Sequence, residues 1–284
     1  MSGGLTVPAA NRNLAKRCGA LQSALMASID TARGRIGFVE VGSSGTPILF
    51  LHGVGSDKSV WRPQLDYFGK TRRAVALDYP GYGESEFGPD ATRDDFGAAV
   101  LAAMDGLGIE KAHVCGLSLG GVIAIAMHSV APDRCASLVI ADSFAVHPQG
   151  QAIYERSTAA SHDMRGLAEA RIGALMVSDG PDLRAKAIDT MAAIDPEAYR
   201  IGARAVWLAE QQERASAVRV PTLILCGDSD AITPPALSEE LAAIIPGSKL
   251  HIIEGASHLA NLDKPAEFNA VIDDFLSGVE AEAY

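Results

Sequence analysis

The chain is dominated by short apolar runs that alternate with helical patterns. Each run is four or five residues long and stops at a glycine, an acidic residue or a histidine–glycine pair; the runs are residues 48–51, 74–77, 112–115, 138–141, 222–226 and 250–253. Such runs favour strands that are buried on both faces of a parallel sheet. Helical patterns lie between or after them, at residues 94–107, 119–130, 235–245 and 265–276. This alternation predicts an α/β fold with a doubly wound, mostly parallel sheet and right-handed crossovers.

The N-terminal part departs from this alternation. Residues 27–41 have the character of two strands around an Arg33-Gly34 turn, which predicts an antiparallel start to the sheet. Residues 1–26 show no clear periodicity, and we expect them to form a loose arm. The α/β core is therefore expected to begin near residue 27.

A second departure lies between the fourth and fifth apolar runs. The 79 residues between Asp142 and Thr222 contain no strand-like run, but several helical segments, including 167–177 and 199–208. This composition predicts a helical insertion between two strands, not a separate domain on a linker. We therefore expect a core made of residues 27–143 and 221–284, with the insertion at residues 144–220.

Composition and charge exclude several classes of partner. The 284 residues are 48% hydrophobic and 21% charged, which is typical of a globular protein. The 24 Lys and Arg against 35 Asp and Glu give a net charge of −11, so phosphate backbones would repel the chain and no nucleic-acid partner is expected. No run approaches 18 apolar residues, so no membrane span is expected either. The segment after Arg17 is too short and too polar for a secretory signal.

The cysteines match no metal or redox motif. Cys18, Cys115, Cys135 and Cys226 are separated by 97, 20 and 91 residues, which fits neither a zinc site nor a CxxC pair. Cys115 and Cys226 lie in apolar runs, where a thiol acts as a small hydrophobic group. We expect all four to be reduced, the protein to be cytoplasmic, and the chemistry to need neither a metal nor a cofactor.

The strongest functional motif is Gly116-Leu117-Ser118-Leu119-Gly120. It follows an apolar run and opens a helical pattern, which is the context of a G-x-S-x-G nucleophile elbow. A strained strand-to-helix turn would project the Ser118 hydroxyl above the sheet, and the flanking glycines would allow close backbone approach. The helix N-terminus would offer N–H groups to developing negative charge. An ordinary glycine-rich turn with an N-cap serine is the alternative.

Candidate partners for Ser118 follow it in the chain. A nucleophilic serine needs a base, and the base needs an orienting carboxylate. Asp230 lies 112 residues after Ser118, and His258 lies 28 residues after Asp230; each follows a predicted strand. Because the carboxyl ends of parallel strands share one edge of the sheet, we expect both side chains near Ser118. Each residue also has a simpler interpretation when it is considered alone. His258 could be a histidine in a surface loop, and Asp230 could stabilise an Asx-turn or cap the next helix.

Two further carboxylates compete with Asp230 for the role of the acid. Asp142 ends the strand after the elbow helix, but it also begins the insertion. Asp228 follows Gly227 directly, which is too early for its side chain to clear the sheet edge. Asp230 is favoured because its turn can direct the carboxylate toward the neighbouring loop that carries His258.

An oxyanion hole is predicted from a second loop. His52-Gly53-Val54-Gly55 follows the first apolar run, and the Val54 amide would pair with the Leu119 amide to bind the oxyanion. A tight glycine turn is the simpler interpretation of this loop. His52 precedes the serine in the chain, and we expect it to organise the loop instead of acting as the base.

These motifs together resemble the α/β-hydrolase superfamily from about residue 28 to residue 277. The resemblance rests on His52-Gly53-Val54-Gly55 with Trp61 after it, on Asp78-Tyr79-Pro80-Gly81-Tyr82-Gly83-Glu84-Ser85, on the elbow, and on Asp230 and His258. Within the superfamily, Cys115 to Gly121 and Gly227 to Pro235 look most similar to 3-oxoadipate enol-lactonases and small carboxylesterases. The resemblance implies a helical cap, which matches residues 144–220.

The resemblance also narrows the reaction. Haloalkane dehalogenases and epoxide hydrolases of this fold carry an aspartate nucleophile, which Ser118 contradicts. Carbon–carbon bond hydrolases commonly have Asn before the serine, where this chain has Leu117. The favoured function is hydrolysis of a small carboxylic ester or lactone, with a carbon–carbon hydrolase or a non-catalytic ligand-binding hydrolase fold as alternatives. The oligomeric state is open.

Substrate-binding residues are expected in the cap and near the oxyanion loop. Trp61 and Trp207 are candidates for the pocket wall, although core packing would suit them equally. The segment 144–220 holds nine of the Lys and Arg residues and ten of the Asp and Glu residues, so it is the least repulsive part of an acidic chain for a substrate carboxylate. The candidate carboxylate-binding residues are Arg165, Arg171, Arg200 and Arg204, with Arg165 and Arg204 favoured.

Overall fold

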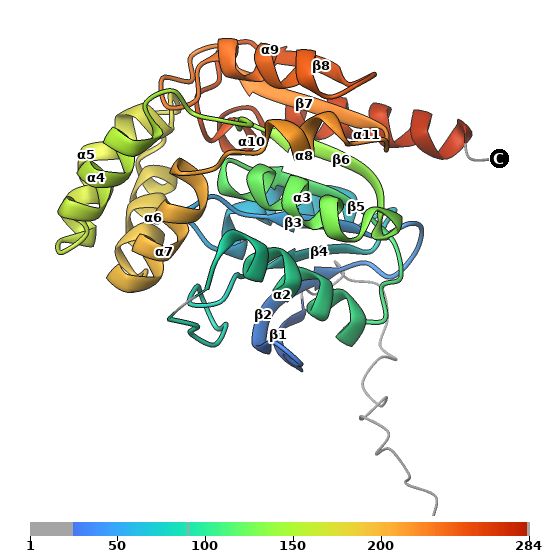
Figure 1. Cartoon of the computed structure of the whole chain (residues 1–284), viewed down its shortest axis with the longest axis horizontal. Coiled ribbons are helices and arrows are strands. Elements are labelled where there is room, and N and C mark those ends of the chain that lie inside the picture. Colours follow the sequence, from blue (N-terminus) through green and yellow to red (C-terminus); the bar gives the residue numbers. More distant parts are fainter. Residues whose placement is uncertain (1–24, 90, 283–284) are drawn as a thin grey trace, which may run out of the picture.

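The computed structural model describes residues 25–89 and 91–282, and one eight-stranded sheet organises them (Figure 1). The strand order is β1-β2-β4-β3-β5-β6-β7-β8. Strand β2 pairs antiparallel with β1 and with β4, and all other neighbours are parallel. The strands are β1 (Leu25–Thr31), β2 (Gly34–Val41), β3 (Ile48–Leu51), β4 (Ala74–Leu77), β5 (Ala112–Leu117), β6 (Cys135–Ala141), β7 (Thr222–Gly227) and β8 (Lys249–Ile253). The mostly parallel sheet and its antiparallel start are confirmed.

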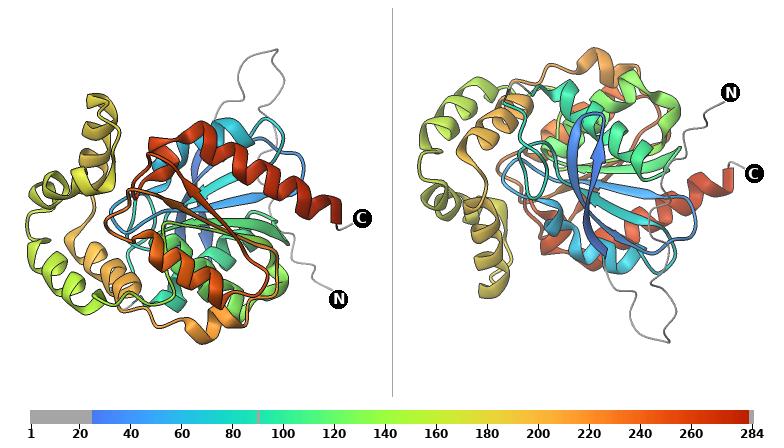
Figure 2. Two further views of the ribbon diagram at one scale, coloured as in Figure 1. Left: turned by 90° about the horizontal axis from the view of Figure 1, so that it is seen from above. Right: turned by 90° about the horizontal axis from the view of Figure 1, so that it is seen from below.

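Helices cover both faces of the sheet (Figure 2). Apolar side chains of α2 (Arg93–Gly106), α3 (Leu119–Val130) and α9 (Pro235–Ile244) pack in one core layer. Those of α1 (Arg62–Phe68) and α11 (Pro265–Glu282) pack in the layer on the other face. Alternate residues of the central strands enter opposite layers, as Leu49 and Phe50 do. This burial on both faces is why the central strands have continuous apolar sequences.

Five helices lie between β6 and β7 in the sequence. They are α4 (Gly150–Ala160), α5 (Met164–Leu175), α6 (Pro181–Ala192), α7 (Pro196–Trp207) and α8 (Gln212–Ser216). In both views of Figure 2, α4 to α7 form a group beside one end of the sheet. Short helical elements complete the chain: η1 (Lys58–Trp61), η2 (Pro132–Arg134) and α10 (Ala260–Asp263).

Three expectations from the sequence are not met or cannot be compared: burial of residues 250–253 on both faces, a last helix over residues 265–276, and a loose arm at residues 1–26. Strand β8 is exposed over much of its length, with Leu250 and Ile252 each 36% exposed, because it is the last strand of the sheet and lacks a neighbour. Helix α11 continues to Glu282 instead of stopping near residue 276. The expected arm at residues 1–26 lies outside the described residues except for the first two residues of β1.

Cys115, Cys135 and Cys226 are buried and free, while Cys18 lies outside the described residues. Within residues 25–89 and 91–282, no helix has the length and apolar character needed to cross a bilayer.

Candidate active site

Ser118 lies on the sharp turn between β5 and α3. Its backbone has φ 53° and ψ −113°, a strained conformation for a residue with a side chain. The flanking glycines permit this turn for steric reasons. A Cβ on Gly116 would lie 2.2 Å from the Gly120 backbone, and a Cβ on Gly120 would lie 2.0 Å from the Leu51 carbonyl oxygen. The glycine spacing around Ser118 is therefore a packing requirement.

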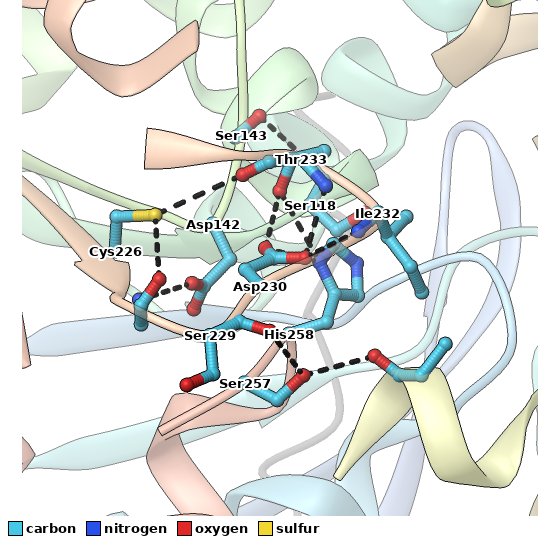
Figure 3. Close-up of polar contacts among 12 residues, drawn as sticks. Ser118, Asp142, Ser143, Cys226, Ser229, Asp230, Ile232, Thr233, Ser257 and His258 are labelled. Carbon is cyan, nitrogen blue, oxygen red and sulfur yellow. Dashed lines mark hydrogen bonds and ion pairs between the residues drawn. The ribbon is translucent and has the colours of Figure 1, made fainter. Parts of the chain in front are cut away.

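Asp230 and His258 form a hydrogen-bonded pair at the same edge of the sheet (Figure 3). Asp230 lies in the turn after β7, and His258 lies in the loop after β8. The distance from His258 Nδ1 to Asp230 Oδ2 is 2.8 Å, and both side chains are almost completely buried. No hydrogen bond joins the Ser118 hydroxyl to the His258 ring in the described structure. Such bonds are often long before substrate binds.

The Asp230 carboxylate accepts four hydrogen bonds. Oδ1 accepts from the amides of Ile232 (2.7 Å) and Thr233 (2.9 Å), and Oδ2 accepts from the Thr233 hydroxyl (2.6 Å) and from His258 Nδ1. Burial alone would raise the pKa of Asp230, but the neighbouring His258 charge and these hydrogen bonds outweigh it and lower the pKa. An ionised Asp230 keeps the proton on Nδ1 and leaves Nε2 free to accept one.

Thr233 was missed by the sequence analysis. Its hydroxyl oxygen also lies 3.2 Å from His258 Nδ1, so it contacts both members of the pair. The available signal was the Asx-turn expected at Asp230, because a carboxylate in such a turn bonds the residues two and three positions later. Asp230 therefore caps its own turn and orients His258 at the same time.

The two competing carboxylates lie elsewhere. Asp142 is fully buried, and its Oδ1 accepts the Gly227 amide at 2.9 Å. Burial, with the nearby Asp230 charge, raises the pKa of Asp142 well above its usual range, which favours the neutral acid. Asp228 is exposed and accepts the Gly255 amide at 2.9 Å. Neither forms a hydrogen bond with His258 within the described part of the chain, so the geometry favours Asp230.

Asp142, Cys226 and Asp230 are the group of possible metal ligands within the described ranges. Their ligand atoms all lie within 4.8 Å of one another. However, both oxygens of Asp230 already accept hydrogen bonds, and burial raises the pKa of the Cys226 thiol, which disfavours the thiolate that binds metals. These donors suit a hydrogen-bonded cluster better than a metal centre.

The predicted oxyanion amides come from two adjoining elements. Val54 lies in the loop after β3, and Leu119 is the first residue of α3. Neither amide has a hydrogen-bond partner among the described residues. Tyrosine hydroxyls hold the loop in place, since Tyr79 donates to the His52 carbonyl (3.2 Å) and Tyr82 to the Val54 carbonyl (3.3 Å). Both amides thus remain available as donors.

His52 is an internal support of this loop. The ring is fully buried, and Nδ1 donates to the Gly53 carbonyl at 2.8 Å. Burial lowers the pKa of His52 despite the nearby Asp78 charge, so the ring is neutral. The ring therefore lies inside the loop that it is predicted to organise.

A cavity of about 440 Å³ opens onto Ser118 and His258. Val54 and Gly53 contribute to its wall beside the serine. The remaining wall comes from the segment 55–66, from α5, α6 and α7, and from the loop after His258; its apolar side chains include Leu175, Leu183, Ala187, Met191, Trp207 and Leu259. The cavity therefore suits a small and largely apolar substrate.

Charged side chains occupy part of the same wall. They are Arg62, Asp66, Arg171 and Lys186. Arg171 is half-buried, and its Nη1 donates to the Tyr199 hydroxyl at 2.9 Å. The guanidinium has five N–H donors, so this bond leaves others for a ligand.

The structure brings some of the predicted substrate-binding residues to the cavity and not others. Trp207 and Arg171 line it. Trp61 is fully buried in the core, 5.0 Å from Phe50 between ring centres, and lies outside the wall. Arg165 is exposed and paired with Asp189 at 2.8 Å, and Arg204 is exposed on α7.

Comparisons with known proteins agree with this architecture. A model of the alpha/beta hydrolase family matches residues 48–271. The chain is 30% identical over 240 residues to a 3-oxoadipate enol-lactonase of Acinetobacter baylyi, covering 82% of this chain and 89% of the relative. It is 29% identical over 254 residues to a pimeloyl-[acyl-carrier protein] methyl ester esterase of Neisseria meningitidis, covering 82% and 94%.

Solved structures of other proteins have the same overall fold. An enol-lactonase from Burkholderia xenovorans superposes with a TM-score of 0.83 at 26% identity, covering 88% of this chain and 100% of that one. A thermophilic esterase from Thermogutta terrifontis also has a TM-score of 0.83, at 27% identity, covering 90% and 99%.

Proposed function

The chain belongs to the alpha/beta hydrolase family, and we propose that it is a serine hydrolase that cleaves a carboxylic ester or lactone through an acyl-enzyme. The observation that carries the proposal is the shared cavity of Ser118, on its strained turn, and His258, hydrogen-bonded to Asp230. The similarity to enol-lactonases and esterases supports the same bond type. Residues 144–220 are the cap in this proposal.

The first half of the reaction forms the acyl-enzyme. Ser118 Oγ attacks the substrate carbonyl carbon while His258 Nε2 takes its proton. The oxyanion receives hydrogen bonds from the Val54 and Leu119 amides, which have no competing partner among the described residues. The bond from the carbonyl carbon to the leaving oxygen then breaks, and Nε2 returns the proton to that oxygen.

The second half releases the acid. A water molecule gives a proton to His258 Nε2 and attacks the acyl carbon. The bond to Ser118 Oγ breaks, and the proton returns to Ser118. In both halves Asp230 holds the Nδ1 proton and stabilises the imidazolium, which its four accepted hydrogen bonds suit because they fix the carboxylate in place.

Covalent labelling tests this proposal. A fluorophosphonate should add its phosphonyl group to Ser118 alone, because only a serine beside a base is strongly nucleophilic. Intact-mass and peptide mass spectrometry should find a single adduct on the peptide that contains residue 118. An unlabelled protein, or an adduct on a different serine, would contradict the assignment.

Arg171 supports a narrower substrate class within the proposal. Its guanidinium lines the cavity, whereas Arg165 points to a surface ion pair with Asp189. Lys186 and Arg62 are further cations on the same wall, but Arg62 is paired with Asp66 at 2.9 Å. We therefore propose that the substrate carries a carboxylate, or a similar anionic group, at the end remote from the bond that is cleaved.

Substitution of Arg171 should separate charged from neutral substrates. Arg171→Ala should lower kcat/KM by roughly ten- to hundredfold for a carboxylate-bearing ester, the range expected for a charge-assisted hydrogen bond, and by less than about threefold for the matched neutral ester. Arg165→Ala is the control and should change neither. Equal losses on both esters would assign Arg171 a structural role and leave a generic esterase.

A further inference from the structure

The loop that carries His258 is hydrogen-bonded to the end of helix α5. The Ser257 hydroxyl donates to the Ala174 carbonyl at 2.9 Å, and the Leu259 amide donates to the Leu175 carbonyl at 2.8 Å. Helix α5 ends at Leu175, so these carbonyls have no partner within the helix. Both chain neighbours of His258 therefore bind the last residues of α5.

A carboxylate makes a second connection between the same two segments. Asp263 Oδ2 accepts the Ser257 amide at 2.9 Å and the Val177 amide at 3.2 Å. Its Oδ1 accepts the Ser178 amide at 2.8 Å. Asp263 thus bridges the His258 loop and the chain that leaves α5.

Helix α5 also contributes to the cavity wall. Arg171 and Leu175 both line it, and they lie four residues apart, about one helical turn. Leu175 therefore contributes its side chain to the cavity wall and its carbonyl to the His258 loop. A ligand group that contacts Arg171 therefore binds about one turn before the helix end that holds the neighbours of His258.

We infer that the end of α5 positions His258, with Ser257 as the positioning residue, so that a substrate anion bound at Arg171 raises kcat and not only affinity. The inference rests on the proposed function and adds to it. Binding energy from a remote part of a substrate accelerates the reaction when it aligns reacting groups. Here the anion bound at Arg171 would hold the C-terminal part of α5 in place. The Ser257 hydroxyl, which is bonded to the Ala174 carbonyl, would then restrict the movement of the adjoining His258 imidazole.

The test measures kcat and KM separately for a matched pair of esters, one with a remote carboxylate and one neutral. In the wild type, the carboxylate should raise kcat by about tenfold, the order of a single aligned hydrogen bond. In Ser257→Ala this advantage in kcat should disappear, with KM changed by less than about twofold. Ser257→Thr keeps the hydroxyl and should retain most of the advantage.

Ser229→Ala is the matched control. Ser229 is exposed in the loop beside Ser257, and its hydroxyl donates to Asp228 without contacting α5. This variant should keep the wild-type kcat ratio. If Ser257→Ala unfolds below the assay temperature, Asp263→Asn weakens the second connection with little change in size and should lose the same ratio.

Failure of this inference is distinct from failure of the proposed function. A wild type whose Ser118 resists fluorophosphonate would overturn the proposed function itself. If Ser118 is labelled but the wild type shows no kcat advantage, or Ser257→Ala lowers kcat equally for both esters, the positioning role is wrong. The proposed hydrolase would then stand without it.

Discussion

Replacement of Ser118 by alanine should reduce kcat on an activated aryl ester by a factor on the order of 10⁴–10⁶, as in serine hydrolases that lose their nucleophile. Alanine leaves the turn geometry and the Asp230–His258 pair unchanged, but it removes the oxygen that attacks the carbonyl. The strained backbone at residue 118 is the same burden for alanine as for serine, so the melting temperature should change little.

The measurement is steady-state turnover of purified wild type and variant. The residual rate sets the upper limit of contamination, and thermal unfolding shows that the fold is retained. Activity within about tenfold of the wild type would mean that the carbonyl is attacked by another group, and the acyl-enzyme mechanism would have to be abandoned.

Asp230→Asn should lower kcat/KM by a factor on the order of 10²–10⁴, because asparagine reverses the tautomer of His258. The Ile232 and Thr233 amides require an oxygen at the Oδ1 position. The side-chain amide would therefore place its NH₂ toward His258 Nδ1, which could then only accept a hydrogen bond. The ring proton would move to Nε2, where a base must be free.

Asp142→Asn is the matched control for this prediction. Burial raises the pKa of Asp142 well above its usual range and so favours the neutral acid, which asparagine matches in shape and in charge. Activity should fall by less than about tenfold, scaled from the effect expected at Asp230. If the two variants exchange these results, the acid lies after β6 and the pairing of Asp230 with His258 is not the catalytic one.

The sequence by itself determined the alternation of strands and helices and the position of the elbow. These features depend on short-range rules. Strands buried on both faces need continuous apolar residues, and the close approach of Gly120 to Leu51 excludes a side chain at position 120. The same rules placed the ends of the strands, and with them Asp230 and His258, at one edge of the sheet.

Only the tertiary structure decided which side chains meet there. Asp142 and Asp230 both follow strands, and the sequence separations from His258 do not indicate which carboxylate reaches the imidazole. The structure pairs Asp230 with it because the Ile232 and Thr233 amides turn that carboxylate toward the His258 loop. Asp142 is instead held by the Gly227 amide.

The residues that line the cavity were the hardest feature of the site to predict from the sequence. Arg171 and Arg165 lie on the same helix, six residues apart, but only Arg171 lines the cavity. The rotation of α5 about its axis decides this, and α5 carries too little contrast between its faces for the sequence to indicate that rotation. The bonds from Ser257 and Leu259 to the end of α5 join segments more than 80 residues apart, and such contacts exist only once the helices have packed against the sheet.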